Sequence, residues 1–160
     1  MTANRQQARA PLISPDDLMH PTLYRMPFTH ADWVFENKLD GFRALVRKGG
    51  RNIELLSRNG RSLAEAFPEV MVTLARLRVD AVLDCELVLA DASAHPRFER
   101  LRRRALIRRP SWVLDAAHQY PATLCVFDML VIGQRDVREK PLPFRKAPVA
   151  ELVEAVPGLP

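Results

Sequence analysis

Two strongly apolar stretches of the sequence carry acidic residues in their interior, and they constrain the fold more than any other feature. Residues 81–89 read Ala-Val-Leu-Asp-Cys-Glu-Leu-Val-Leu, and residues 124–130 read Leu-Cys-Val-Phe-Asp-Met-Leu. Their length and composition predict buried strands. A carboxylate is costly to bury without a partner, so Asp84 and Asp128 each require one. We expect Asp128 to be structural, with hydrogen bonds from the backbone or from an arginine.

Periodicity and turn residues predict the other elements. A Gly-Gly pair at 49–50 predicts a two-residue hairpin turn, and an Asn-Gly pair at 59–60 predicts the next turn. Residues 1–30 are rich in proline and are expected to form an irregular lead-in to a domain over 31–160. The element order predicts an α+β fold with mostly antiparallel sheets and flanking helices. The expected strands are 33–36, 42–48, 52–57, 81–89 and 124–130, and the expected helices are 67–77, 98–106 and 145–156.

Length and composition exclude several classes of protein. The 160 residues suffice for one domain with its own core. No apolar run approaches the roughly 20 residues of a membrane span, and the first residues lack the apolar segment of a signal peptide. Cys85 and Cys125 lie in apolar runs without metal-ligand spacing, as is typical of a reducing compartment. We therefore expect a cytoplasmic protein that does not bind membranes. The four histidines form no pattern that indicates a role.

The positive charge of the chain is concentrated in one short stretch. Residues 97–109 contain seven arginines and one glutamate, a net charge of +6, whereas the whole chain has a net charge of +5. The other residues therefore sum to −1. One basic patch on a near-neutral chain favours contact with a polyanion. A solvated helix face is the alternative explanation for a charge run of this kind.

Lys38 is a candidate nucleophile because of its neighbours. It begins a glycine-containing turn after an apolar run, and Glu36 and Asp40 flank it two residues away on either side. A lysine with an ordinary pKa of about 10.4 is a poor nucleophile at neutral pH. Desolvation, or cations such as Arg43 and Arg58, would lower the pKa and free the amine. The alternative is a plain surface lysine in a hairpin turn.

Four short motifs resemble those of the covalent nucleotidyltransferases, the superfamily of ATP-dependent DNA ligases, RNA ligases and mRNA capping enzymes. Residues 38–43 match Lys-x-Asp-Gly-x-Arg (motif I), and residues 57–60 match the Ser-Arg-x-Gly turn of DNA ligases. Residues 83–87 resemble motif III, with Cys85 in place of the usual glycine, and residues 126–130 resemble motif IIIa. Because all four occur in the family order, the chain is most similar to bacterial ATP-dependent DNA ligases of the repair type.

The resemblance implies a role for each matched residue. Lys38 would attack the α-phosphate of ATP and hold AMP as a phosphoramidate, and the AMP would then activate nicked double-stranded DNA for sealing. Mg²⁺ would assist the phosphoryl chemistry. The implied nucleotide contacts are Glu36 at the adenine amino group, Arg43 and Arg58 at the ribose and phosphates, Glu86 at the ribose or as a metal ligand, and Phe127 stacked on the adenine.

The resemblance also gives the basic stretch a role. It coincides with a helix that follows motif III in bacterial ligases, with Arg102 in place of a glutamine. The expected contacts with DNA phosphates are Arg97, Arg100, Arg102, Arg103 and Arg104.

Other interpretations of the same residues remain open at this stage. Phe127 lies in an apolar strand and could be plain core. Asp84 and Glu86 are two residues apart, so they point to one face of their strand, which could be the solvent face. An RNA ligase or a capping guanylyltransferase uses the same lysine chemistry. A catalytically dead fragment that only binds nucleic acid would need no more than residues 97–109.

The resemblance extends over residues 11 to about 155 but lacks later parts of the family pattern. Motif IV (a Glu-Gly pair), the lysines of motif V, motif VI and an oligonucleotide-binding domain have no counterpart in the sequence. Residues 31–160 are therefore expected to form an incomplete ligase adenylation domain. We expect a fragment or half of a split enzyme, weak or inactive as a ligase on its own, for which a second chain with the missing motifs is a candidate partner.

Overall fold

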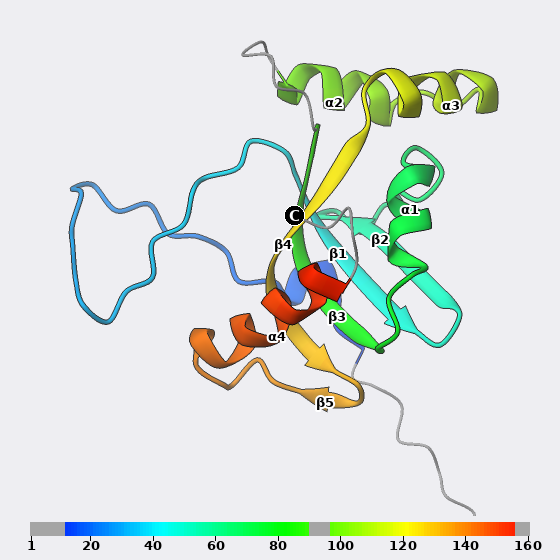
Figure 1. Ribbon diagram of the computed structural model, residues 1–160. Coiled ribbons are helices and arrows are strands. Elements are labelled where there is room, and N and C mark those ends of the chain that lie inside the picture. Colours follow the sequence, from blue (N-terminus) through cyan, green and yellow to red (C-terminus); the bar gives the residue numbers. More distant parts are fainter. Residues whose placement is uncertain (1–11, 90–96, 156–160) are drawn as a thin grey trace, which may run out of the picture.

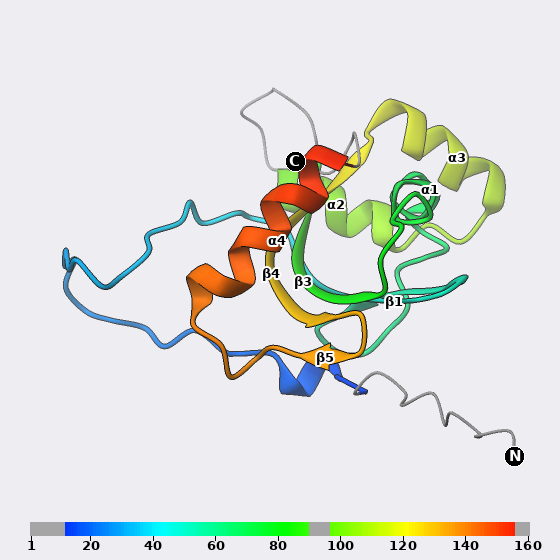
Figure 2. The ribbon, with the colours of Figure 1, turned by 60° about the horizontal axis from the view of Figure 1, so that its bottom comes forward.

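The fold is built on one curved antiparallel sheet with helices on its main face. The computed structural model describes residues 12–89 and 97–155. The sheet has the strand order β2-β1-β3-β4-β5, and every neighbouring pair is antiparallel. Figures 1 and 2 show its curvature, which is strongest along β3 and β4. The strands are β1 (Phe42–Gly49), β2 (Asn52–Ser57), β3 (Ala81–Leu89), β4 (Ala122–Ile132) and β5 (Arg135–Asp136). The expected α+β fold with antiparallel pairing is confirmed.

Helices flank this sheet within the described part of the chain. They are the 3₁₀ turn η1 (Pro15–Asp17), α1 (Pro68–Leu74), α2 (Arg97–Ala105), α3 (Pro110–Gln119) and α4 (Leu142–Ala155). Helix α1 is shorter than the predicted 67–77, and α4 begins three residues before the predicted start. The sequence did not predict α3, because only Val113 of that helix is fully buried and no apolar stripe marks it. None of the described helices is long and apolar enough to cross a membrane.

Two sequence predictions about the strands and turns are corrected by the structure. The hairpin turn lies at residues 50–51, because Gly49 is still paired with Asn52. Gly50 takes the positive φ of 56° that such a turn requires. Residues 33–36 do not form a strand. In the described structure they are exposed and pair with no other strand, and an extended segment without a partner forms no sheet.

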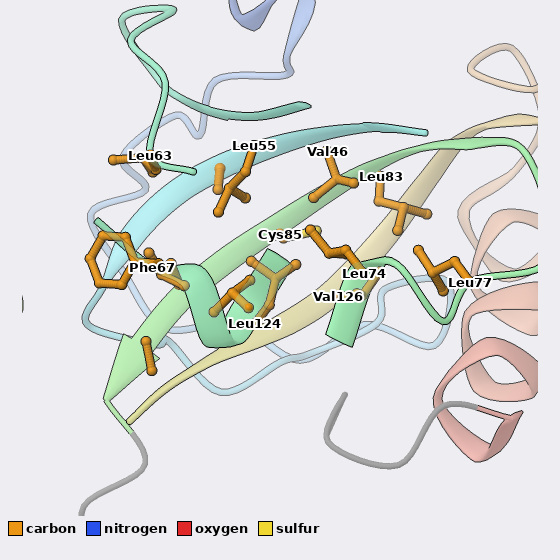
Figure 3. Packing of buried hydrophobic residues seen from close by; sticks show 14 of the residues in the cluster. Val46, Leu55, Leu63, Phe67, Leu74, Leu77, Leu83, Cys85, Leu124 and Val126 are labelled. Atoms are coloured by element: carbon orange, nitrogen blue, oxygen red, sulfur yellow. The ribbon is translucent and has the colours of Figure 1, made fainter. Parts of the chain in front are cut away.

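Alternation along the strands separates the two faces of the sheet. The main core contains Leu83, Cys85 and Leu87 of β3, packed with residues of β1, β2 and β4 against helices α1, α2 and α4. Figure 3 shows part of this core, with Leu83 and Cys85 of β3 and Leu124 and Val126 of β4 facing Leu74 of α1. The intervening residues Asp84 and Glu86 of β3 therefore point to the opposite face, as their spacing predicts. A smaller apolar cluster on that face includes Ile13 and Leu18, which lie on either side of η1, with Leu45 and Val82 of the sheet.

A buried ion pair fixes helix α4 to the sheet. Arg145 Nη1 of α4 donates to Asp128 Oδ2 of β4 at 2.7 Å, and both residues are buried. Burial raises the pKa of Asp128, because desolvation outweighs the opposite effect of the Arg145 charge. The expectation that Asp128 is a structural acid bound by an arginine is confirmed. One oxygen of Asp128 and the Nε of Arg145 have no hydrogen-bond partner, so the pair rests on a single charged hydrogen bond.

We predict that Asp128→Ala lowers the free energy of unfolding by about 3–5 kcal/mol, because it leaves the buried guanidinium of Arg145 unpaired. The double variant Asp128→Leu/Arg145→Met removes both charges and should recover most of that loss. Urea unfolding followed by circular dichroism measures both. Asp136→Ala is the matched control, because its pair with Arg138 is partly exposed (37% and 34% for the Arg138 and Asp136 side chains) and should be worth about 1 kcal/mol or less. A double variant as unstable as the single one would contradict the prediction.

Candidate functional site

A bidentate ion pair between neighbouring strands forms the centre of the site. Arg43 of β1 donates from Nε to Asp84 Oδ1 at 3.0 Å and from Nη2 to Asp84 Oδ2 at 2.6 Å. The Asp84 side chain is only 3% exposed, so Arg43 is the partner that its buried charge requires. The hydrogen bond to Asp84, more than any other contact, raises the pKa of Arg43. Because two of the three guanidinium nitrogens are engaged, Nη1 remains for the predicted contact with a nucleotide.

The glycine of the Lys-x-Asp-Gly-x-Arg motif is required by its contact with β3. The Gly41 N–H donates to Glu86 Oε1 at 3.0 Å. A Cβ at Gly41 would clash with the carbonyl oxygen of Leu87 and lie 2.8 Å from a methyl of Val88, so only glycine fits without a shift of the backbone. Burial raises the pKa of Glu86, although the bond from Gly41 acts in the opposite direction. The first and third motifs of the sequence therefore meet directly in the fold.

Phe127 is brought to the same face by an irregularity in β4. Asp84 pairs with Asp128, whereas the next residue, Cys85, pairs with Val126. Phe127 is thus the extra residue of a β-bulge, and bulges redirect side chains in this way. The Arg43 guanidinium carbon lies 5.7 Å from the centre of the Phe127 ring. Phe127 is half-buried and belongs to neither apolar cluster, so the alternative that it is plain core is not supported.

Lys38 lies on an exposed segment next to this face. Residues 19–40, which we call the arm, contain no helix or strand and are exposed throughout. The arm projects from the sheet in both views (Figures 1 and 2). The Lys38 side chain is 84% exposed and is paired with Asp40. The hydrogen bond to Asp40, followed by the Asp40 charge, raises the pKa of Lys38. The contacts of Lys38 in this conformation therefore act against the lowering of its pKa that a nucleophilic amine requires.

The structure adds Lys146, which the sequence did not single out. Lys146 of α4 forms an ion pair with Glu36 of the arm, 110 residues away in the chain, and its Nζ also donates to the Phe127 carbonyl at 3.0 Å. No motif marks this lysine. The only signal was its place beside Arg145 in a predicted helix, and a local pattern does not identify a partner so distant in sequence.

Arg58 lies apart from the other predicted nucleotide contacts. It is exposed in the turn after β2. The last residue pair of the β1–β2 hairpin is Ala44 with Ser57. Arg58 is the next residue of the chain, so it lies at the end of the sheet where β1 begins. No described contact joins Arg58 to Arg43, Glu86 or Phe127, and its role stays a prediction.

The basic stretch splits into exposed and buried arginines. Arg102 and Arg103 are exposed, within 4.0 Å of Glu99, and Arg100 stacks on the Tyr120 ring at 4.6 Å. The side chain of Arg97 lies outside the described part of the structure. The structure corrects one predicted DNA contact, Arg104. This arginine is only 3% exposed, pairs with Glu69, donates to the carbonyl oxygens of Tyr120 and Ala66, and stacks on Phe67. A guanidinium so enclosed cannot reach a phosphate.

The described carboxylates do not by themselves form a metal centre. No group of three or more His, Cys, Asp or Glu residues converges in the described part of the chain. Asp84 is engaged by Arg43, and one oxygen of Glu86 accepts from Gly41. The other oxygen of Glu86, Oε2, has no hydrogen bond among the described contacts and is a candidate ligand for a cation.

Comparison with known proteins agrees with this arrangement of motifs. Residues 20–159 match the family described as "ATP dependent DNA ligase domain", and the chain belongs to that family. DNA ligase C1 of Mycolicibacterium smegmatis is 36% identical over 134 residues, which cover 81% of this chain and 38% of the relative. The bifunctional non-homologous end joining protein LigD of Bacillus subtilis is 31% identical over 143 residues, covering 86% of this chain and 23% of that protein.

Solved structures share the fold. The ligase domain of LigD from M. tuberculosis superposes with a TM-score of 0.59 at 24% identity, covering 78% of this chain and 38% of that one. Mycobacterial DNA ligase D in complex with ATP and MES gives a TM-score of 0.58 at the same identity. The chain spans less than two fifths of the length of each relative and structure compared here.

We predict that Asp40→Asn lowers the pKa of Lys38. The carboxylate of Asp40 stabilises the ammonium form, so its removal increases the neutral, reactive fraction of the amine at any pH below the wild-type pKa. Acetylation of Lys38 by acetic anhydride, followed by mass spectrometry from pH 7 to pH 10, should show a curve shifted to lower pH in the variant. Lys140, which is also exposed, is the internal control and should keep its curve. Identical Lys38 curves for wild type and variant would contradict the prediction.

Proposed function

We propose that this chain carries the lysine-adenylation chemistry of an ATP-dependent DNA ligase. In this proposal, the neutral Nζ of Lys38 attacks the α-phosphorus of ATP. An N–P bond forms and the bond between the α-phosphorus and pyrophosphate breaks. The attacking nitrogen, which is positively charged once the N–P bond has formed, then loses one proton to solvent. The AMP then passes to the 5′-phosphate of a DNA nick, and the 3′-hydroxyl displaces it to seal the strand. The observation that carries the proposal is the junction of the Lys38–Arg43 motif with β3 through Gly41–Glu86 and Arg43–Asp84.

The face beside this junction supplies groups suited to a nucleotide. The Phe127 ring offers an apolar surface for a base. Lys146 links Glu36 to the backbone of Phe127, so Glu36 lies near the ring and offers an acceptor for an adenine amino group. The positive charges of Arg43 and Arg58 would neutralise phosphate charge, which is the main protein contribution in phosphoryl transfer.

Mg²⁺ is part of the proposal through Glu86 and the nucleotide itself. Magnesium is commonly bound by one or two carboxylates together with substrate phosphates. The oxygen of Glu86 that does not accept from Gly41 fits that mode as a single protein ligand. The ion would neutralise charge on the phosphates of ATP.

Lys38 must lose its present contact before it can react. In this conformation the amine is exposed and held by Asp40. We propose that a second polypeptide segment with the remaining family motifs, whether in the same gene product or in a complementing chain, encloses Lys38 and lowers its pKa by desolvation. The proposal places the chain in the cytoplasm, where it would meet ATP and nicked double-stranded DNA.

A second candidate function is nucleic-acid binding without adenylation. The exposed amine of Lys38 favours it, as do the arginines of α2 and of the turn that leads into α3 (Arg100, Arg102, Arg103 and Arg109), which we call the basic face. On this face Arg100 stacks on Tyr120, and Arg109 lies 5.3 Å from the Trp112 ring. This candidate needs no lysine adduct, so an adenylation assay separates it from the first.

The adenylation test uses the full chain with [α-³²P]ATP and MgCl₂, followed by denaturing electrophoresis. We expect weak label on the wild-type chain, stronger label when the missing segment of a related ligase is added, and none with Lys38→Ala. Lys140→Ala is the matched control, because Lys140 is also exposed, and it should label like wild type. Label with [α-³²P]GTP instead of ATP would favour a capping-type enzyme. The complete absence of label, even with the added segment, would refute adenylation.

We predict that Arg102→Gln/Arg103→Gln weakens binding to nicked duplex DNA and makes it less dependent on salt. Each lost phosphate contact should reduce the slope of log K against log[salt] by about 0.9. Fluorescence anisotropy from 50 to 200 mM NaCl measures the slope. The matched control, Arg76→Gln/Arg78→Gln, removes two exposed arginines at the end of α1 and should keep the wild-type slope. Equal slopes for the two double variants would show that the basic face does not bind DNA.

A further inference from the structure

Lys146 makes the only described side-chain contact between the arm and the rest of the protein. The other hydrogen bonds, ion pairs and ring contacts of residues 19–40 are internal, such as Lys38–Asp40 and Phe28 with Trp33. Among the described residues, the arm is otherwise anchored where the chain enters it at buried Leu18 and leaves it at Gly41, and the charge of Glu86 acts on Lys38. The position of Glu36 therefore depends on Lys146.

Lys146 is itself held in place by a rigid neighbour. The adjacent Arg145 is buried in its pair with Asp128, which fixes this turn of α4 against β4. From that turn, Lys146 Nζ donates to the carbonyl of Phe127 at 3.0 Å while it pairs with Glu36. One ammonium group thus links the carboxylate on the arm to the backbone of the residue whose ring faces Arg43.

We propose that Lys146 is a positioning residue that fixes Glu36 relative to Phe127 and thereby sets the preference for adenine. This inference rests on the proposed function, in which Phe127 binds the face of the base and Glu36 binds its edge. Lys146 engages Oε1 of Glu36, which leaves Oε2 as an acceptor. A carboxylate oxygen accepts a hydrogen bond from the 6-amino group of adenine and repels the 6-oxo group of hypoxanthine. Selection between these bases requires the carboxylate to be held at a fixed place beside the stacked ring.

The consequence is that the loss of Lys146 changes selectivity rather than only stability. Without the ammonium, Glu36 moves with the arm and the base edge is no longer read at a fixed position. A guanidinium at 146 can still pair with Glu36 and donate to the Phe127 carbonyl, so Lys146→Arg should preserve the effect, whereas Lys146→Met keeps the length of the side chain but removes the charge.

The experiment has two independent readouts on the full chain. Chymotrypsin cleaves after aromatic residues, which the arm contains at Tyr24, Phe28, Trp33 and Phe35, so its rate of cleavage there reports how firmly the arm is held. Competition of ATP and ITP against [α-³²P]ATP labelling, with the complementing segment present, reports base preference. Lys146→Met should speed arm cleavage about three- to fivefold, the scale of a partly exposed charged contact, and should lower the ATP-over-ITP preference by a similar factor.

The controls separate this role from a general loss of structure. Lys146→Arg and Lys140→Met should resemble wild type in both readouts. Glu36→Gln should loosen the arm as Lys146→Met does, and the double variant should be no looser than either, because both remove the same contact. If Lys146→Met shifts the midpoint of urea unfolding, that variant has a folding defect. Glu36→Gln, which breaks the same contact from the exposed arm, then tests the tether.

Each outcome decides a different claim. Unchanged arm cleavage in Lys146→Met would overturn the tether. Faster cleavage with an unchanged ATP-over-ITP preference would overturn the role in selectivity. Failure of the wild-type chain to label at all, even with the complementing segment, would refute the proposed function and the selectivity role together. The cleavage rates would then still decide whether Lys146 holds the arm.

Discussion

The charged pair between Arg43 and Asp84 is the interaction on which the rest of the site depends. It joins β1 to β3, the central strand of the sheet. It also neutralises the buried charge of Asp84, which the apolar strand β3 could not carry without a partner. It also holds Arg43 beside the Phe127 ring. The neighbouring contact of Gly41 with Glu86 fixes the start of β1 against β3. The pairing of β1 with β3 therefore both neutralises a buried charge and positions the residues that are proposed to bind the nucleotide.

The contrast between this rigid face and the exposed arm explains the chemical state of Lys38. A lysine becomes a nucleophile when its charged form is disfavoured, through desolvation or nearby cations. On the exposed arm neither condition holds, and Asp40 acts in the opposite direction. The aligned residues make up only 38% and 23% of the lengths of the two relatives. In the proposed mechanism, the low-dielectric surroundings of the lysine come from outside the described residues, whereas the groups that bind the base come from within them.

Helix geometry separates the arginines of the basic stretch into packed residues and exposed residues. Arg100 and Arg104 are four residues apart on one side of α2, where one stacks on Tyr120 and the other is buried with Glu69. Arg102 and Arg103 lie on the exposed side. The net charge of residues 97–109 alone predicts one basic patch and does not separate the two groups. The 3.6-residue period of a helix is the reason that one of the five predicted DNA contacts, Arg104, became a structural residue instead.

The sequence by itself determined strands β1 to β4, the α+β class, the common face of Asp84 and Glu86, and the need of Asp128 for a partner, because alternation and the cost of burying charge are local signals. It did not determine that residues 33–36 lack a strand partner, that Arg104 is buried, or that Lys146 meets Glu36. Tertiary structure decided these features, because each depends on which segments meet across long separations in the chain, and no periodic pattern in one segment records the position of the other.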